Sequence, residues 1–284
     1  MDEKEYLKLL DLLFQVVEAN KGPITGDDDR YLDAEGLAAK FFAHAASILY
    51  LSRGTHILDF PSTPVGFIDS ASINVLARTA LETFLTFYYV FFAPGTKDEQ
   101  DYRCLTYKAA GLAERQQLPV STEENRQKLA DEKTQLDDLC NKLRSNAIFR
   151  SLSQKQQSEV LTAPRDIWRK TFVNGKWRPL SWHDIAINAG FSKMLAQHTY
   201  RYLSGYAHSS SASIMQIKEL LEKEQMQLIE VPMNTINIAT ANLIDEYSRL
   251  FPRAKNALHA DTGRGIVEEW IQIGQKLESE DGER

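Results

Sequence analysis

Residues 70–92 read SASINVLARTALETFLTFYYVFF, and this stretch decides the fold. A helix made from it is apolar on nearly all sides, and Pro94-Gly95 follows as a stop signal. Its most apolar part, 84–93, is too short to span a bilayer, and Arg78 and Glu82 precede that part in the same helix. The stretch therefore predicts the central helix of a soluble bundle, with no membrane contact.

Helical periodicity continues on both sides of this central helix. Apolar side chains recur every three to four residues in 6–17 and in 37–49. Further helices are predicted over 96–117, 121–145, 153–163, 181–190, 192–208, 212–228, 234–257 and 264–277. The fold class is therefore predicted to be all-α, a multi-helix bundle.

Only one segment favours strands. An Asn-Gly pair lies between apolar residues within 171–177 and predicts a small β-hairpin. The segment 56–66 holds Pro61 and Pro64, so we expect a loop there. At most one minor hairpin is thus expected in the chain.

The domain organisation is predicted to be a single helical domain over 1–284. Residues 121–145 open on the capping sequence Ser-Thr-Glu-Glu and hold few apolar side chains. They are predicted to form a polar helical arm, either exposed or paired as one half of a helical hairpin. The charged tail 278–284 is expected to fray.

Composition narrows the class of protein. Hydrophobic residues make up 43% of the 284, enough for a sizeable core, and the net charge of −6 argues against general polyanion binding. Cys104 and Cys140 show no metal-ligand spacing, and the acidic start has no apolar targeting segment, so we expect a reduced, cytoplasmic protein. Motifs typical of metalloproteases, NTPases and dehydrogenases do not occur.

The strongest sign of chemistry is YRYLSGYAHSS, residues 200–210. It places Arg201 and His208 seven positions apart, close to two helical turns, on nearly the same face. A permanent cation beside a group that titrates near neutrality predicts a phosphate-handling catalytic pair. Side chains lean toward the helix N-terminus, so one chain closes poorly on a phosphate and a homodimer would close better. The alternative is a histidine bonded to a neighbouring helix and an arginine in a surface ion pair.

Four other residues are predicted to support this pair. Ser204 keeps the face between the two side chains small, and His198 lies three positions before the arginine. Arg78 and Glu82 stand at i and i+4 on the apolar central helix, where buried charges need partners. They either form an ion pair that fixes the bundle register or contribute to the site.

A basic and aromatic run, RDIWRKTFVNGKWR at 165–178, carries a local charge of +4. Rings interleaved with cations suit single-stranded nucleic acid. The residues predicted to contact RNA are Arg165, Trp168, Arg169, Lys170, Lys176, Trp177 and Arg178. The alternative is that the tryptophans pack on the bundle while the cations stay solvated.

Two stretches are similar to a widespread bacterial family of uncharacterised helical proteins. LARTALE at 76–82 resembles the central-helix pattern of that family, and YRYLSGYAH at 200–208 resembles its C-terminal YxxLSxxxH signature. The likeness extends over roughly 34–214. It implies an all-helical fold and carries no settled activity.

Arg201 and His208 also resemble the R-x4–6-H motif of HEPN domains, which are dimeric α-helical modules. Many HEPN domains are metal-independent RNases of toxin–antitoxin and phage-defence systems. The resemblance implies a HEPN-like core in which Arg201 binds the scissile phosphate of RNA and His208 transfers protons, without a metal or cofactor. It also implies an antitoxin or another protein as partner. Tyr202 departs from the polar residue that commonly follows the arginine.

Two other functions stay open at this point. One is a non-catalytic helical module of a defence or stress pathway, which binds a protein or small ligand and uses the Arg and His residues as a buried polar network. The other is binding of phosphate or a nucleotide without turnover. A His208 that is buried and bonded within one chain favours the module, whereas two copies facing a common cleft favour the nuclease.

Overall fold

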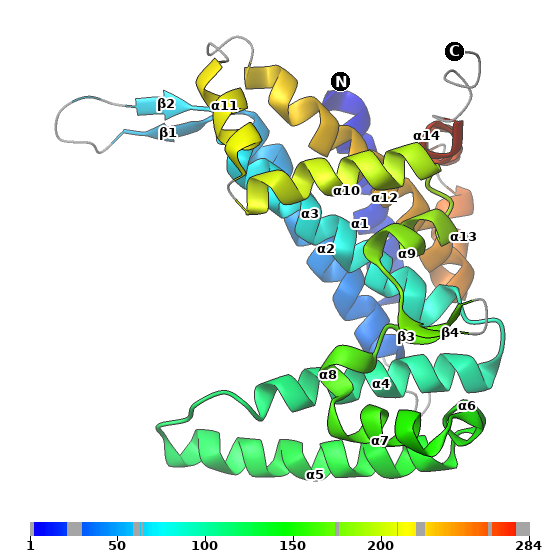
Figure 1. Ribbon diagram of the computed structural model, residues 1–284. Helices are drawn as coiled ribbons and strands as arrows, with labels where there is room; N and C mark the ends of the chain where they lie inside the picture. Colours follow the sequence, from blue (N-terminus) through cyan, green and yellow to red (C-terminus); the bar gives the residue numbers. More distant parts are fainter. Residues whose placement is uncertain are drawn as a thin grey trace. The chain divides into compact units, whose positions relative to one another are not determined.

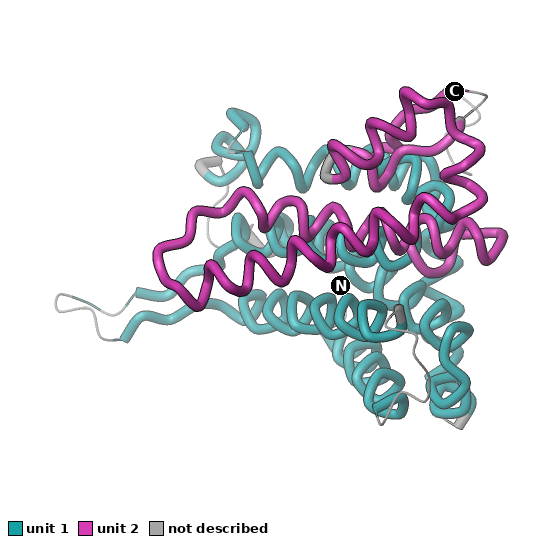
Figure 2. Tube along the Cα trace, turned by 90° about the horizontal axis from the view of Figure 1, so that it is seen from below, with its two compact units in different colours: residues 1–88, 182–284 teal, residues 89–181 magenta. Residues whose placement is uncertain are grey.

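A computed structural model describes residues 3–21, 30–58, 63, 65–173, 176–208, 210–219, 225–260 and 263–276. The chain forms two compact units, Met1–Tyr88 with Trp182–Arg284, and Tyr89–Ser181 (Figure 2). Within the described ranges the fold is all-α, as predicted, and the only strands form two small two-stranded sheets. The tail 278–284 lies outside the described residues.

The first unit is built from helices and one hairpin (Figure 1). Its elements are α1 Glu3–Asn20, α2 Arg30–Ser52, β1 Thr55–Ile57, β2 Val65–Phe67, α3 Ser70–Phe87, α9 Trp182–Asn188, α10 Lys193–Ala207, α11 Ser211–Glu219, α12 Gln225–Leu250, α13 Pro252–Ala260 and α14 Arg264–Lys276.

The centre of this unit is α3, as its all-round apolar character predicts. Asp69 begins the helix by accepting a hydrogen bond from the Ser72 amide at 2.9 Å. Helices α2, α9, α10 and α12 all contact α3. Phe84 and Leu85 are fully buried there, each contributing on the order of 2 kcal/mol from removal of apolar surface.

The apolar helical stretch Ser70–Phe92 is long enough to cross a membrane by length and composition. However, 61% of its apolar window is buried inside the protein. A buried apolar helix of this kind fits the core of a soluble protein rather than a lipid-facing span.

Three local expectations are wrong. The helix predicted over 234–257 is divided, because α12 ends at Leu250 and α13 begins at Pro252. Residues 56–66 are not a loop throughout, because β1 and β2 pair antiparallel with His56 opposite Gly66, so the chain has a second small hairpin. The two prolines did not prevent this pairing because both fall between the strands. The predicted break between 228 and 234 is also absent, because α12 runs through Pro232.

Helix α12 continues past Pro232 because the carbonyl that the proline leaves free has other donors. Proline has no N–H, so the Leu228 carbonyl four residues earlier loses its helical partner. The Asn74 amide from α3 donates to this oxygen at 3.3 Å, and the Tyr202 hydroxyl from α10 donates at 3.4 Å. The carbonyl is therefore satisfied by neighbouring helices rather than left unpaired in the core.

The second unit contains the polar segment. Its elements are the π-helix η1 Tyr88–Phe92, whose first residue belongs to the first unit, α4 Lys97–Arg115, α5 Glu123–Ser145, α6 Ala147–Ser151, α7 Gln154–Thr162, α8 Pro164–Ile167, β3 Lys170–Val173 and β4 Lys176–Pro179. Helices α4 and α5 lie side by side, so the polar helix is one half of a helical hairpin (Figures 1 and 2). Thr122, rather than Ser121, is its N-cap.

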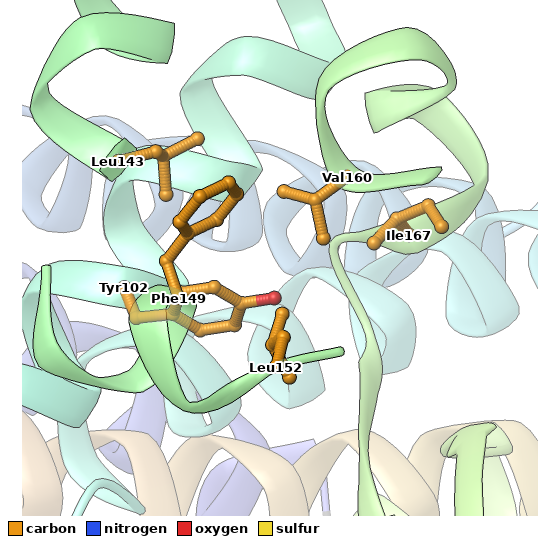
Figure 3. Close-up of a cluster of buried hydrophobic side chains, with 6 residues drawn as sticks. All are labelled: Tyr102, Leu143, Phe149, Leu152, Val160 and Ile167. Carbon is orange, nitrogen blue, oxygen red and sulfur yellow. The ribbon is translucent and has the colours of Figure 1, made fainter. Parts of the chain in front are cut away.

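Few apolar side chains are needed to hold this unit together. Tyr102, Leu143, Phe149, Leu152, Val160 and Ile167 form its buried cluster (Figure 3). Arg115 and the nearly buried Glu132 join α4 to α5 by an ion pair of 2.7 Å. The predicted hairpin is confirmed, because β3 and β4 pair antiparallel with Val173 opposite Lys176, whereas 174–175 lie outside the described residues.

Candidate functional site

Helices α3 and α10 of the first unit bring four polar side chains together. Arg78 donates from Nε to Glu82 Oε1 at 3.1 Å, from Nη2 to the Tyr200 hydroxyl at 3.1 Å, and from Nη1 to His208 Nε2 at 3.0 Å. The Tyr200 hydroxyl donates in turn to Glu82 Oε1 at 2.9 Å. A guanidinium with three different acceptors is held in one orientation.

Helix geometry explains why these side chains meet. Arg78 and Glu82 are one turn apart on α3 and share a face. Tyr200, Ser204 and His208 are spaced by four along α10, so they follow one edge of it, and α10 crosses α3 (Figure 1). His208 is the C-cap of α10, where its amide donates to the Ser204 carbonyl at 3.1 Å. The imidazole therefore sits where the helix ends.

Electrostatics strengthen the pairing at Arg78. Burial by itself lowers the pKa of Arg78, but the Tyr200 hydrogen bond and the Glu82 carboxylate outweigh it and raise the pKa overall. Burial and the hydrogen bond to Glu82 raise the pKa of Tyr200, so its hydroxyl keeps its proton at neutral pH. Arginine has only donors, so His208 Nε2 must be the acceptor in its contact with Arg78, which assigns the proton of a neutral ring to Nδ1.

The two residues of the predicted catalytic pair have different surroundings. His208 is exposed and joined to Arg78. Arg201 is also exposed, and no hydrogen bond or ion pair joins it to another described residue. Leu203 and Tyr206 are buried on the side of α10 that faces the bundle, so Arg201 lies on the outward side.

The four residues that were predicted to support the pair also differ in their contacts. Arg78 contacts His208 and also forms the i,i+4 ion pair with Glu82, so features of both alternatives are present, whereas Glu82 bonds to Arg78 and Tyr200. The Ser204 hydroxyl is enclosed and has no hydrogen-bond partner among the described residues. His198 is exposed on α10 and makes no contact with His208 in the described structure.

The basic and aromatic run belongs to the second unit, and much of it is packed. Trp168 contacts the rings of Tyr89 and Tyr107 edge-on, with centroids 5.8 and 5.4 Å away. Burial raises the pKa of Tyr89 to about 12, which shows how enclosed this ring cluster is. Trp177 packs against the buried cluster of the unit. Neither tryptophan presents a free stacking face like that of an isolated surface ring.

The cations of this run are distributed between packed and exposed positions. Lys170 pairs with Glu159 at 3.2 Å, and Arg169 donates to the Leu180 carbonyl at 3.3 Å. Lys176 is exposed, whereas Arg178 is half-buried and donates to the Pro179 carbonyl at 3.3 Å. The side chain of Arg165 lies outside the described part of the structure.

Tyr200 is a polar member of the site that the sequence analysis did not single out. The spacing Tyr200–Ser204–His208 was the available signal, because it puts the phenol on the edge that carries the histidine. Tyr202, which departs from the HEPN pattern, faces inward and donates to Leu228 instead.

Chemically, the site offers a lone pair on an exposed imidazole and an oriented guanidinium beside it. These groups can move a proton and bind an anion. The described residues contain no group of three or more His, Cys, Asp or Glu side chains arranged to hold a metal ion.

Comparisons with known proteins place the chain in a family. Neither the search of curated proteins nor that of solved structures gave a match. A family model described as "Family of unknown function (DUF5677)" matches residues 36–226, which is more than half of the chain and includes both α3 and α10. The chain therefore belongs to this family of helical proteins of unknown function, DUF5677.

Proposed function

We propose that this protein is a HEPN-like, metal-independent endoribonuclease in which His208 moves the protons. The observation that carries the proposal is the exposed imidazole of His208, whose Nε2 is 3.0 Å from a guanidinium nitrogen of Arg78. An accessible base next to a fixed cation is what phosphodiester transesterification requires.

The reaction needs only RNA and these side chains. Nε2 of His208 takes the proton from a ribose 2′-hydroxyl, and the 2′-oxygen forms a bond to the adjacent phosphorus. The phosphorus–5′-oxygen bond breaks, and the imidazolium returns its proton to that leaving oxygen. The products are a 2′,3′-cyclic phosphate and a 5′-hydroxyl, and cationic arginines stabilise the charge on the pentacoordinate phosphorus.

A homodimer supports this chemistry, because Arg201 lies exposed on the same helix and a second copy could bring its own Arg201 toward the histidine. Lys176 and its neighbours in the second unit are proposed to add RNA contacts. A toxin or phage-defence role, with an antitoxin or other protein as partner, belongs to the same proposal.

Incubation of purified protein with diverse single-stranded RNAs in the presence of EDTA tests the function. Wild type is expected to cleave, and His208→Ala is expected to lose about 100-fold or more of the rate. RNAs that stay intact, or an Arg201→Ala/His208→Ala variant that cleaves as fast as wild type, would overturn the proposal.

A second candidate is a non-catalytic module that binds a protein or small ligand. One observation favours it: within one chain, Arg78 bonds to Glu82, Tyr200 and His208, and Tyr200 bonds to Glu82, so these contacts join α3 to α10. On this view the network sets the packing of the two helices. Intact RNA together with a strongly destabilised His208→Ala protein would support the module.

A further inference from the structure

The Arg78 guanidinium has N–H donors that no described residue accepts from. A guanidinium carries five N–H groups, one on Nε and two on each terminal nitrogen. Glu82, Tyr200 and His208 engage one N–H on each of the three nitrogens. No other described residue accepts from Arg78, so one N–H remains on Nη1 and one on Nη2. The free donor on Nη2, together with the Nη1 donor that now faces His208, suits the paired oxygens of a phosphate group.

The surroundings keep this arginine in place. Its side chain is 21% exposed and that of Glu82 is 28% exposed, so both are largely enclosed yet reachable. Tyr200 closes a triangle between them by accepting from Arg78 and donating to Glu82. A pre-oriented cation loses little side-chain entropy when an anion binds. Glu82 and Tyr200 therefore act as positioning residues for Arg78.

Arg201 lacks all of these supports. It is exposed on the outward side of α10, and no described residue holds it. A long, solvated side chain of this kind must be ordered when it binds a phosphate, which costs affinity. Within one chain, Arg78 is thus the better-prepared phosphate ligand, although it lies 130 positions from His208.

We propose that Arg78 and His208 together form a binding site for a phosphate group, and that Arg78 rather than Arg201 is the cation that contacts it. The inference rests on the proposed function for its use in RNA cleavage, but the binding itself does not require turnover. One phosphate oxygen accepts from the free N–H of Arg78 Nη2, and a second takes the place of His208 Nε2 on Nη1. That exchange frees the Nε2 lone pair to take the proton of a 2′-hydroxyl.

The Glu82 carboxylate is the one negative group bonded to Arg78, and it does not block the site. Its Oε1 is engaged by Arg78 Nε and by the Tyr200 hydroxyl, whereas the remaining donors are on Nη1 and Nη2. A phosphate on the terminal nitrogens therefore approaches away from the carboxylate-bonded Nε. The carboxylate orients the guanidinium while the terminal nitrogens meet the ligand.

Binding of two probes tests this site. The first is a short all-deoxy oligonucleotide, which carries phosphodiesters but lacks the 2′-hydroxyl needed for cleavage, and the second is inorganic phosphate. Kd is measured for wild type, for Arg78→Lys and Arg201→Gln, which the inference distinguishes, and for the matched control Arg253→Lys at an exposed arginine of α13, with the fold of each checked by circular dichroism and Tm. Arg78→Lys keeps the charge but loses the paired donors.

We expect Arg78→Lys to weaken oligonucleotide binding about tenfold or more, Arg201→Gln to weaken it less than Arg78→Lys does, and Arg253→Lys to change it less than about twofold. Binding of phosphate alone with the same pattern assigns the site to free phosphate rather than to a nucleic acid, and still supports it. The inference is overturned if Arg201→Gln weakens binding more than Arg78→Lys does. It is also overturned if wild type binds neither probe.

RNA cleavage measured on the same proteins separates this inference from the proposed function. If wild type binds the deoxy probe through Arg78 but leaves RNA intact, the phosphate site is supported and the nuclease proposal is contradicted. If cleavage is lost in Arg201→Gln and retained in Arg78→Lys, the nuclease proposal is supported and the phosphate site at Arg78 is contradicted.

Discussion

Arg78 and His208 are separated by 130 positions in the sequence and meet at 3.0 Å between Nη1 and Nε2. The contact joins the buried central helix α3 to the exposed end of α10. His208 thus has an arginine partner, Arg78, from another helix. Arg201, the arginine of its own sequence motif, is a different residue on α10.

Removal of the Tyr200 hydroxyl should loosen the site. Tyr200→Phe deletes both the acceptor for Arg78 Nη2 and the donor to Glu82. We expect the free energy of unfolding to fall by about 1–2 kcal/mol, measured by urea denaturation. Tyr50→Phe, at a side chain that is 73% exposed, is the matched control and should change nothing measurable. Equal effects of the two substitutions would show that the triangle contributes no stability.

The satisfied carbonyl at Leu228 predicts coupling between Tyr202 and Pro232. Tyr202→Phe removes one of the two side-chain donors that replace the missing proline N–H. We expect it to cost about 1 kcal/mol in the wild-type background and clearly less in Pro232→Ala, where the helix supplies its own N–H. A double-mutant cycle by chemical denaturation measures this. A coupling energy of zero would mean that the carbonyl does not depend on Tyr202.

Glu246 on α12 is only 5% exposed, and its Oε2 has no hydrogen-bond partner among the described residues. Burial, then Asp245, raises the pKa of Glu246 well above its ordinary value. The unfolded chain releases this proton at lower pH than the folded protein, so native stability falls as pH rises above the unfolded pKa. Glu246→Gln should therefore raise Tm near about pH 7 and lose that advantage near about pH 4.

The Tm of wild type and of Glu246→Gln, measured between about pH 4 and about pH 7, tests this prediction. Glu230→Gln, at an exposed glutamate of the same helix, is the control. A Glu246→Gln gain that is the same at both pH values would show that ionisation of the carboxyl is not its cause.

RNA binding by the second unit should depend on Lys176 more than on Lys170. Lys176 is exposed, whereas Lys170 is paired with Glu159. We expect Lys176→Gln to weaken RNA binding and to reduce the slope of log K against log salt concentration by about 1. Lys97→Gln, at another exposed lysine of the unit, serves as the control. Identical salt slopes for the Lys176 and Lys97 variants would contradict an RNA contact at the hairpin.

The all-α fold and the central helix could be predicted because residues 70–92 are apolar on nearly all sides, a pattern typical of a buried helix. The path of α12 could not, since Pro232 normally breaks a helix and its tolerance depends on Asn74 and Tyr202 from other helices. The hairpin around His56 escaped prediction for a similar reason, because its pairing spans two prolines.

Part of the polar network was predictable from the sequence, and its connections between helices were not. Helical spacing identified Arg78 with Glu82 as a pair, because partners on one helix follow from periodicity, but it also paired Arg201 with His208, which no contact joins in the described structure. The contact between Arg78 and His208 depends on how α10 crosses α3, which no local pattern encodes. Tyr200 was missed because a tyrosine beside leucine and alanine is as typical of a core face as of a polar site.

The chemical ends of cleaved RNA test the central claim most directly. Single-stranded RNA is incubated with wild type, His208→Ala and the matched control His198→Ala, an exposed histidine of the same helix, all in EDTA. We predict 2′,3′-cyclic phosphate and 5′-hydroxyl ends from wild type and His198→Ala, and about 100-fold less product from His208→Ala. Intact RNA with wild type, or the same ends at the same rate from His208→Ala, would contradict the account.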